Sequence, residues 1–194
     1  MRQIITKQQA EEKARRKKTI VGIVLVGLML LSTAGYAFFS GERQSTSSET
    51  KISYNEIKFN LLSDQLWHFY IDSKEYATSF NPKQTENISI TGKFNASEYS
   101  GKTVYFSSDS SIEGVNEILN NLGSTIKRTQ YACLEDNCTE DWPVKSCSTD
   151  NIIILQTAEK SSVKKVANCV YIMSTENETL KASDAFIFKS LGVI

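Results

Sequence analysis

Four cysteines are the residues of this chain whose type and spacing point most directly to chemistry. They are Cys133, Cys138, Cys147 and Cys169, all in the last third of the 194 residues. An even number of cysteines outside the cytoplasm, where other features of the chain place them, predicts two disulfide bonds. Three connectivities are possible. We favour Cys133–Cys138, which closes a small loop, and Cys147–Cys169, which joins two expected strands.

A zinc site and a redox-active dithiol are alternatives that the spacing disfavours. The pattern C-x4-C-x8-C-x21-C lacks the C-x2-C pairs of zinc ribbons, and no histidine lies nearby. A thioredoxin-like site needs C-x-x-C at the start of a helix, and the closest pair here is C-x4-C. We therefore predict disulfides, with no metal and no cofactor.

Two side chains are candidates for acid–base chemistry. His68, the only histidine, lies between two aromatic residues on an expected strand. Without an acid and a nucleophile in a motif around it, such a histidine predicts a packed or surface imidazole. Asp184 falls on the apolar stripe of an expected helix, so its carboxyl group should be partly buried and need a partner. A backbone amide or a lysine is the simpler partner, and a functional carboxylate with a raised pKa is the alternative.

The remaining polar motifs are short. No G-x-S-x-G, H-E-x-x-H or glycine-rich phosphate-binding motif occurs, so no catalytic residue is assigned. The acidic residues 135–136 and 140–141 lack the D-x-D-x-D-G frame of a calcium loop, which predicts a solvated loop. Four N-x-[ST] sequons are candidate N-glycosylation sites: Asn87, Asn95, Asn137 and Asn177.

An apolar run near the N-terminus is the element that sets where this chemistry takes place. Residues 20–39 form a run of twenty without a charge. As a helix the run would be about 30 Å long, the thickness of a bilayer's hydrocarbon core. Its length and its terminal aromatic residues favour a retained anchor over a signal peptide cleaved near residues 32–34.

Charge sets the expected orientation. Residues 1–18 carry seven basic and two acidic residues, a net charge of +5, which holds them in the cytoplasm. The rest of the chain carries fifteen basic and twenty acidic residues, a net charge of −5, which argues against a nucleic-acid partner. The expected partners are the lipid bilayer and other cell-envelope proteins.

The sequence therefore predicts four segments: a basic cytoplasmic head (1–18), a transmembrane helix (19–40), a flexible stalk (41–51) and a globular extracytoplasmic domain (52–194). The stalk is rich in serine and threonine. The domain has enough aromatic residues and few enough prolines to bury a core.

The first part of the domain predicts a β-meander. Strands are expected at 57–61, 66–71 and 76–80, with turns at 63–64 and 72–74. Asn81-Pro82 should stop the third strand, because proline cannot extend a β-ladder.

The second part predicts a mixed sheet with two packed helices. Strand 103–107, a helix capped by Ser110 and ended by Gly123 in a left-handed conformation, and strand 125–133 form a βαβ unit. Strands 151–156 and 166–173 are expected to form a hairpin, which places Cys147 near Cys169. A helix at 180–191 completes the order β-α-β-β-β-α, an α+β or α/β fold, and 88–92 is a further short strand.

Several short motifs in a fixed order resemble uncharacterised archaeal single-pass membrane-anchored ectodomain proteins. The motifs are Phe80-Asn81-Pro82, Val104-Tyr105-Phe106, Trp142-Pro143-Val144, Asn168-Cys169-Val170, Lys181-Ala182-Ser183-Asp184 and Leu191-Gly192-Val193-Ile194. The resemblance implies an archaeal cell envelope, with disulfides and N-glycans. It implies no activity, so no catalytic residue can be transferred.

Two functions follow as hypotheses. The first is a membrane-anchored, non-enzymatic domain that binds or scaffolds at the cell surface. The second is an envelope enzyme, either a hydrolase using Asp184 or His68 or a thiol–disulfide protein.

Overall fold

The computed structural model describes residues 16, 18–26, 28–29, 50–108, 111–134, 138 and 140–194, and the chain divides into the units Met1–Ser48 and Glu49–Ile194. In the first unit, residues 18–26 and 28–29 are helical. Most of the predicted head, the later part of the predicted span and the stalk up to residue 49 lie outside the described residues. Within the described part of the chain, no helix has both the length and the apolar character needed to cross a membrane.

The second unit begins with a four-stranded antiparallel meander. Its strands are β1 (Lys51–Tyr54), β2 (Ile57–Leu61), β3 (Trp67–Ile71) and β4 (Lys74–Thr78), hydrogen-bonded in that order. Two tight turns have positive φ at both central residues, Asn55 and Glu56 in the first and Asp72 and Ser73 in the second. This backbone matches the twist of a two-residue hairpin. The predicted meander is confirmed, with β1 as an additional strand.

The meander is followed by a short helix that was not expected, α2 (Pro82–Thr85). The Asn81 side chain accepts a hydrogen bond from the Gln84 amide at 3.1 Å, and the Gln84 side chain accepts one from the Asn81 amide at 2.9 Å. Pro82 fits the first turn of α2. Backbone N–H groups in the first turn of a helix have no partner within the helix, so the N–H that proline lacks is not missed there. Asn81-Pro82 therefore stops the meander as predicted, and it does so by starting a helix.

The six-stranded mixed sheet has the order β5-β9-β10-β8-β6-β7. Its strands are β5 (Ser89–Thr91), β6 (Thr103–Ser108), β7 (Arg128–Tyr131), β8 (Asn151–Thr157), β9 (Ser162–Val166) and β10 (Cys169–Ser174). Helix α3 (Ile112–Leu122) joins β6 to β7, which pair in parallel. This is the predicted βαβ unit, and together the two sheets and the helices make the fold α+β.

The predicted hairpin between strands 151–156 and 166–173 is wrong. Strand β10 pairs with β8 in parallel and forms a hairpin with β9 instead. Strand β9 was missed because its sequence, Ser-Val-Lys-Lys-Val, carries only two apolar residues. This additional strand reverses the chain once more, so the second part has the order β-α-β-β-β-β-α.

The predicted caps of α3 also need correction. Ser110 lies outside the described residues, and the observed N-cap is Ser111, whose hydroxyl oxygen accepts a hydrogen bond from the Glu113 amide at 3.1 Å. Gly123 has a φ of −58°, a right-handed conformation, because the chain continues into a 3-10 turn, Gly123–Thr125. The second long helix, α4 (Thr179–Ser190), is confirmed, and Gly192 after it has a φ of +72°.

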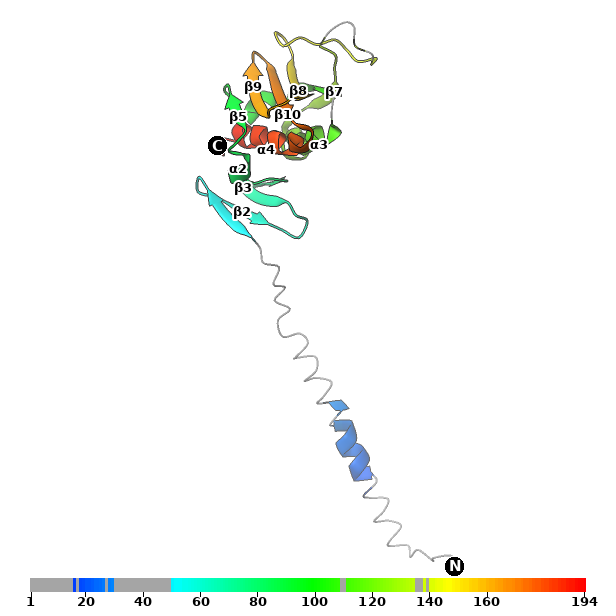
Figure 1. The fold of residues 1–194 in the computed structure, drawn as a ribbon. Coiled ribbons are helices and arrows are strands. Elements are labelled where there is room, and N and C mark those ends of the chain that lie inside the picture. Colours follow the sequence, from blue (N-terminus) through cyan, green and yellow to red (C-terminus); the bar gives the residue numbers. More distant parts are fainter. Residues whose placement is uncertain are drawn as a thin grey trace, which may run out of the picture. The chain divides into compact units, whose positions relative to one another are not determined.

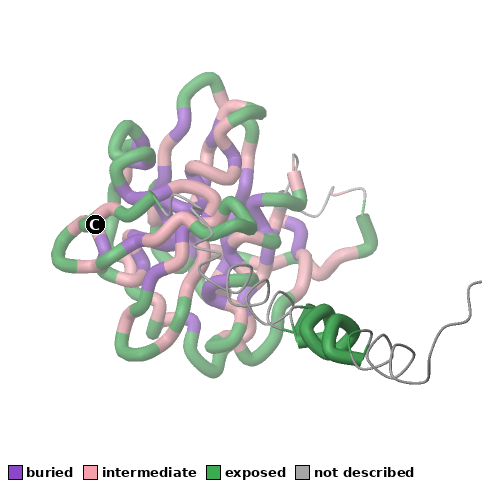
Figure 2. Tube along the Cα trace, turned by 90° about the horizontal axis from the view of Figure 1, so that it is seen from below, coloured by how far each residue is buried: buried purple, intermediate pink, exposed green. Residues whose placement is uncertain are grey.

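Helices α3 and α4 form a layer between the two sheets (Figure 1). One face of α4 packs Ala182, Ala185 and Phe186 against the six-stranded sheet. Its other face packs Phe188 with Phe59 and Phe69 of the meander. Because α4 is covered on both sides, most of its residues are buried, and buried positions lie throughout the interior of this unit (Figure 2).

The outer face of the six-stranded sheet has a small core of its own. Ile152, Ile154 and Cys169 are buried there, and Leu134 and Cys147 pack against them from the long connection between β7 and β8. Successive residues of β8 thus serve different cores, since Ile153 and Leu155 face the helices. The alternation explains why this strand is apolar on both faces.

Candidate functional site

All four cysteines are paired as predicted. Disulfides join Cys133 to Cys138 and Cys147 to Cys169, and no cysteine is free. Cys169 lies opposite Ile152 in the parallel register of β10 and β8. Cys147 precedes β8, and because β8 and β10 run parallel, the start of β8 lies beside Cys169 at the start of β10. The pairing is thus as predicted, although the hairpin expected to produce it does not form. Both bridges fasten the long connection to the sheet.

Asp184 is fully buried on α4, deeper than the sequence predicted. Its Oδ2 atom accepts a hydrogen bond of 2.8 Å from the backbone amide of Phe80, just after β4. Its Oδ1 atom has no donor partner among the described residues. The predicted backbone partner is therefore present. It is the amide of Phe80, in the segment that leaves the meander after β4.

Two side chains of α3 hold the same stretch of chain. Glu117 Oε1 accepts hydrogen bonds from the Ser79 amide at 2.8 Å and from the Ser79 hydroxyl at 3.1 Å. Asn121 accepts from the Ala77 amide at 3.1 Å and donates to the Ala77 carbonyl at 2.8 Å. The free edge of β4 and the residues after it are thus closed by side chains of the helix layer.

The pKa of Asp184 is raised well above its ordinary value. Burial is the largest cause, and the charge of Glu117 and a hydrogen bond with its side chain add to it, against the smaller opposing effect of the Phe80 and Ser79 amides. A neutral Asp184 carboxyl can accept from Phe80 and donate its proton toward Glu117. Because its carboxyl group is shielded from solvent, Asp184 has a structural role: it links helix α4 to the end of the meander.

His68 lies in a separate group on the meander surface. Its Nε2 atom is 2.8 Å from Asp64 Oδ2, and its Nδ1 atom is 2.9 Å from Glu75 Oε1. Both nitrogens can donate to carboxylates only in the doubly protonated ring. Partial burial of the ring opposes the charge, but the hydrogen bonds to Asp64 and Glu75 outweigh it and raise the pKa of His68. With both nitrogens occupied, His68 is poorly placed to act as a general base.

The acids that hold His68 respond in the opposite direction. The Leu66 amide and the imidazole lower the pKa of Asp64, while hydrogen bonds from His68 and Tyr70 lower the pKa of Glu75. The three groups therefore form a charged cluster that ties the turn before β3 to β4.

The remaining predicted sites lie at the surface or outside the described residues. Asn87, Asn95 and Asn177 are exposed, and the Asn95 side chain accepts a hydrogen bond from the Ser97 amide at 2.9 Å. Asn137 and the acidic residues 135–136 lie outside the described residues. Among those that are described, no group of His, Cys, Asp and Glu has an arrangement that could hold a metal ion.

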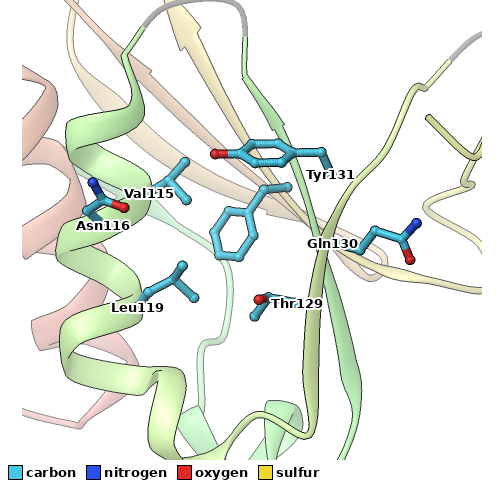
Figure 3. Close-up of a pocket in the computed structure, with 7 residues that line it drawn as sticks. Val115, Asn116, Leu119, Thr129, Gln130 and Tyr131 are labelled. Atoms are coloured by element: carbon cyan, nitrogen blue, oxygen red, sulfur yellow. The ribbon is translucent and has the colours of Figure 1, made fainter. Parts of the chain in front are cut away.

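A groove between α3 and β7 is a feature of the surface that sequence reasoning missed. It has a volume of about 250 Å³, and Phe106 and Leu119 are among its lining residues. The side chains of Thr129 and Tyr131 point into it from β7, while Gln130 points away (Figure 3). No local signal in the sequence marks this groove, because its lining residues come from three separate elements, β6, α3 and β7.

Comparisons with protein-family models, curated proteins and solved structures found no match to this chain. Its function must therefore be inferred from its own geometry.

Proposed function

We propose that this chain is a membrane-anchored extracytoplasmic domain that binds or scaffolds other components of the cell envelope. Residues 19–40 would hold it in the bilayer, with the basic head in the cytoplasm. The resemblance to archaeal ectodomain proteins agrees with this assignment. The observation that carries the proposal is the pairing of all four cysteines in two disulfides, which persist in oxidising compartments.

The positions of the two acid–base candidates favour binding over catalysis. His68 has a carboxylate at each ring nitrogen, and Asp184 is fully buried with an amide on one oxygen. A hydrolase that used either residue would have to break these hydrogen bonds before it met a substrate. A thiol–disulfide activity is disfavoured by the Cys147–Cys169 bridge, because Cys169 is fully buried.

The exposed apolar groove supports a binding role. An apolar depression next to a sheet edge is typical of surfaces that receive another chain. The disulfide-fastened connection and the packed layers would present this groove on a rigid support.

The topology can be tested by labelling intact cells that produce the full chain. Single variants Gln3→Cys, in the head, and Ser47→Cys, before the domain, are treated with a membrane-impermeant maleimide. We expect Ser47→Cys to be labelled in intact cells and Gln3→Cys only after lysis, with the native cysteines unlabelled until they are reduced. Labelling of Gln3→Cys in intact cells, or free native thiols, would overturn the proposal.

A further inference from the structure

Two edge strands, β4 of the meander and β7 of the six-stranded sheet, differ in how their outer side is covered. The edge of β4 is closed by helix side chains, with Asn121 on Ala77 and Glu117 on Ser79. Strand β7 pairs with β6 on one side, and no strand lies on its other side among the residues that the structure describes. An open strand edge is a template for pairing with another chain.

The backbone shows which groups of β7 are open. The Ala132 amide faces β6, where it donates to the Phe106 carbonyl at 2.9 Å. The next residue, Cys133, faces the other way: its amide donates to the Pro143 carbonyl at 3.1 Å, and its carbonyl accepts from the Lys145 amide at 2.8 Å. The open side of this strand is therefore already used for strand-like pairing just beyond the end of β7.

Along a β-strand, the backbone N–H and C=O groups of successive residues point alternately to the two sides, so the outward direction seen at Cys133 can be assigned to earlier residues of β7. Backbone groups two residues apart face the same side, so those of Tyr131 and Thr129 share the outward direction of Cys133. The side chains of the same two residues line the groove (Figure 3). A strand added at this edge would bond to Thr129 and lie along an apolar groove at the same time.

The charged residues at the two ends of β7 indicate which chain could supply the added strand. Lys127 and Arg128, both exposed, lie at the start of β7. The exposed acids Glu140 and Asp141 lie near its end, next to Trp142, which stacks on Tyr131 with ring centroids 4.9 Å apart. The edge is thus basic at one end and acidic at the other.

We propose that a second copy of this chain docks here, with β7 of each copy paired antiparallel about a two-fold axis near Thr129. This arrangement brings the basic start of each β7 to the acidic end of the other, whereas parallel pairing would oppose like charges. The inference deepens the proposed function, on which it rests, by naming the chain itself as a partner.

The first test is cross-linking of the full chain in membranes. In an antiparallel pair, residues directly opposite have Cβ atoms about 4.5–5.5 Å apart, close to the span of a disulfide. Thr129→Cys is therefore expected to give a disulfide-linked dimer under mild oxidation. The matched control is Ser53→Cys, exposed on β1 at an edge of the meander, and it should stay monomeric.

The second test uses charge. Arg128→Glu places an acid near the acidic end of the other copy, so the dimer fraction measured by sedimentation in detergent micelles should fall, with a dissociation constant raised about tenfold or more. Lys58→Glu makes the same change on an exposed residue of β2 and should leave the dimer fraction unchanged. Equal cross-linking at positions 129 and 53, no cross-linking at 129, or an equal effect of the two charge variants would overturn the dimer. Because the maleimide experiment reports topology separately, failure of the dimer leaves its result intact.

Discussion

Asp184 and Phe80 lie 104 residues apart in the sequence, and the Asp184 Oδ2 atom accepts a hydrogen bond of 2.8 Å from the Phe80 amide. This contact joins the helix layer to the chain that leaves the meander. Its acceptor belongs to a buried carboxyl group whose pKa is raised, chiefly by burial and further by the nearby charge of Glu117. The attachment of one layer to the other should therefore depend on pH.

Replacing the carboxyl group separates its two roles. Asp184→Ala leaves the Phe80 amide without its acceptor and should lower the free energy of unfolding by about 1–3 kcal/mol. Asp184→Asn retains an acceptor for Phe80 and supplies a permanent donor toward Glu117. We expect this variant to be at least as stable as the wild type at pH 7, as measured by urea unfolding followed through tryptophan fluorescence.

The direction of the pH dependence follows from proton binding. The folded state holds the Asp184 proton more tightly than the unfolded chain does, whose reference pKa is 3.8. Stability should therefore be complete below that value and fall as the pH rises from there through the folded pKa. Asp184→Asn should remove this part of the slope, and equal slopes in the two proteins would show that Asp184 is ionised in the folded state.

His68 should titrate above the ordinary histidine pKa of 6.5. Because it is the only histidine, its Cε1 resonance can be followed by NMR without assignment variants. The raised pKa means that the His68 contribution to stability is complete below pH 6.5 and is lost as the pH rises through the folded value. Asp64→Asn and Glu75→Gln should each lower the pKa of His68. A His68 pKa that is unchanged in both variants would refute the arrangement in which each ring nitrogen is bonded to a carboxylate.

Gly114 marks the closest approach of α3 to its neighbours. A Cβ atom at this position would lie 2.6 Å from the Leu155 side chain and 2.7 Å from the Ser183 hydroxyl oxygen. Gly114→Ala should therefore cost about 1–3 kcal/mol through overpacking, despite the better helix propensity of alanine. Gly123→Ala is the control, since its nearest neighbours lie at 3.8 Å and its φ suits alanine. Similar unfolding free energies for the two variants would contradict the close packing.

How far the sequence predicts this fold depends on the range of each interaction. The strand at 151–156 and the helix at 180–191 were found because their patterns are local and strong. Strand β9 was missed because lysines occupy two positions of a weakly apolar segment of five residues, and that omission reversed the inferred direction of β10. A strand's direction depends on the whole chain between it and its neighbour, which local periodicity does not encode.

The same distinction holds for the candidate sites. The sequence indicated that Asp184 needs a partner, because an acid on an apolar stripe must be compensated. It could not identify Phe80 or Glu117, which reach Asp184 only when α3 and α4 lie side by side and the meander packs on them. The groove beside β7 was missed for a related reason: its lining comes from β6, α3 and β7, which meet only in the folded chain.

The two disulfides offer the last prediction, because they differ in the length of chain that they close. The paired cysteines are 22 residues apart in Cys147–Cys169 and 5 residues apart in Cys133–Cys138. Loop-closure entropy then predicts a stabilisation of about 3 kcal/mol for the longer loop and about 2 kcal/mol for the shorter one. Removing Cys147 and Cys169 should cost more still, because Cys169 is fully buried and packs with Ile152 and Ile154 on the outer face of the sheet. Urea unfolding of the two double-alanine variants measures this order, and a larger loss on removing Cys133 and Cys138 would show that the short bridge, rather than the long one, holds the connection to the sheet.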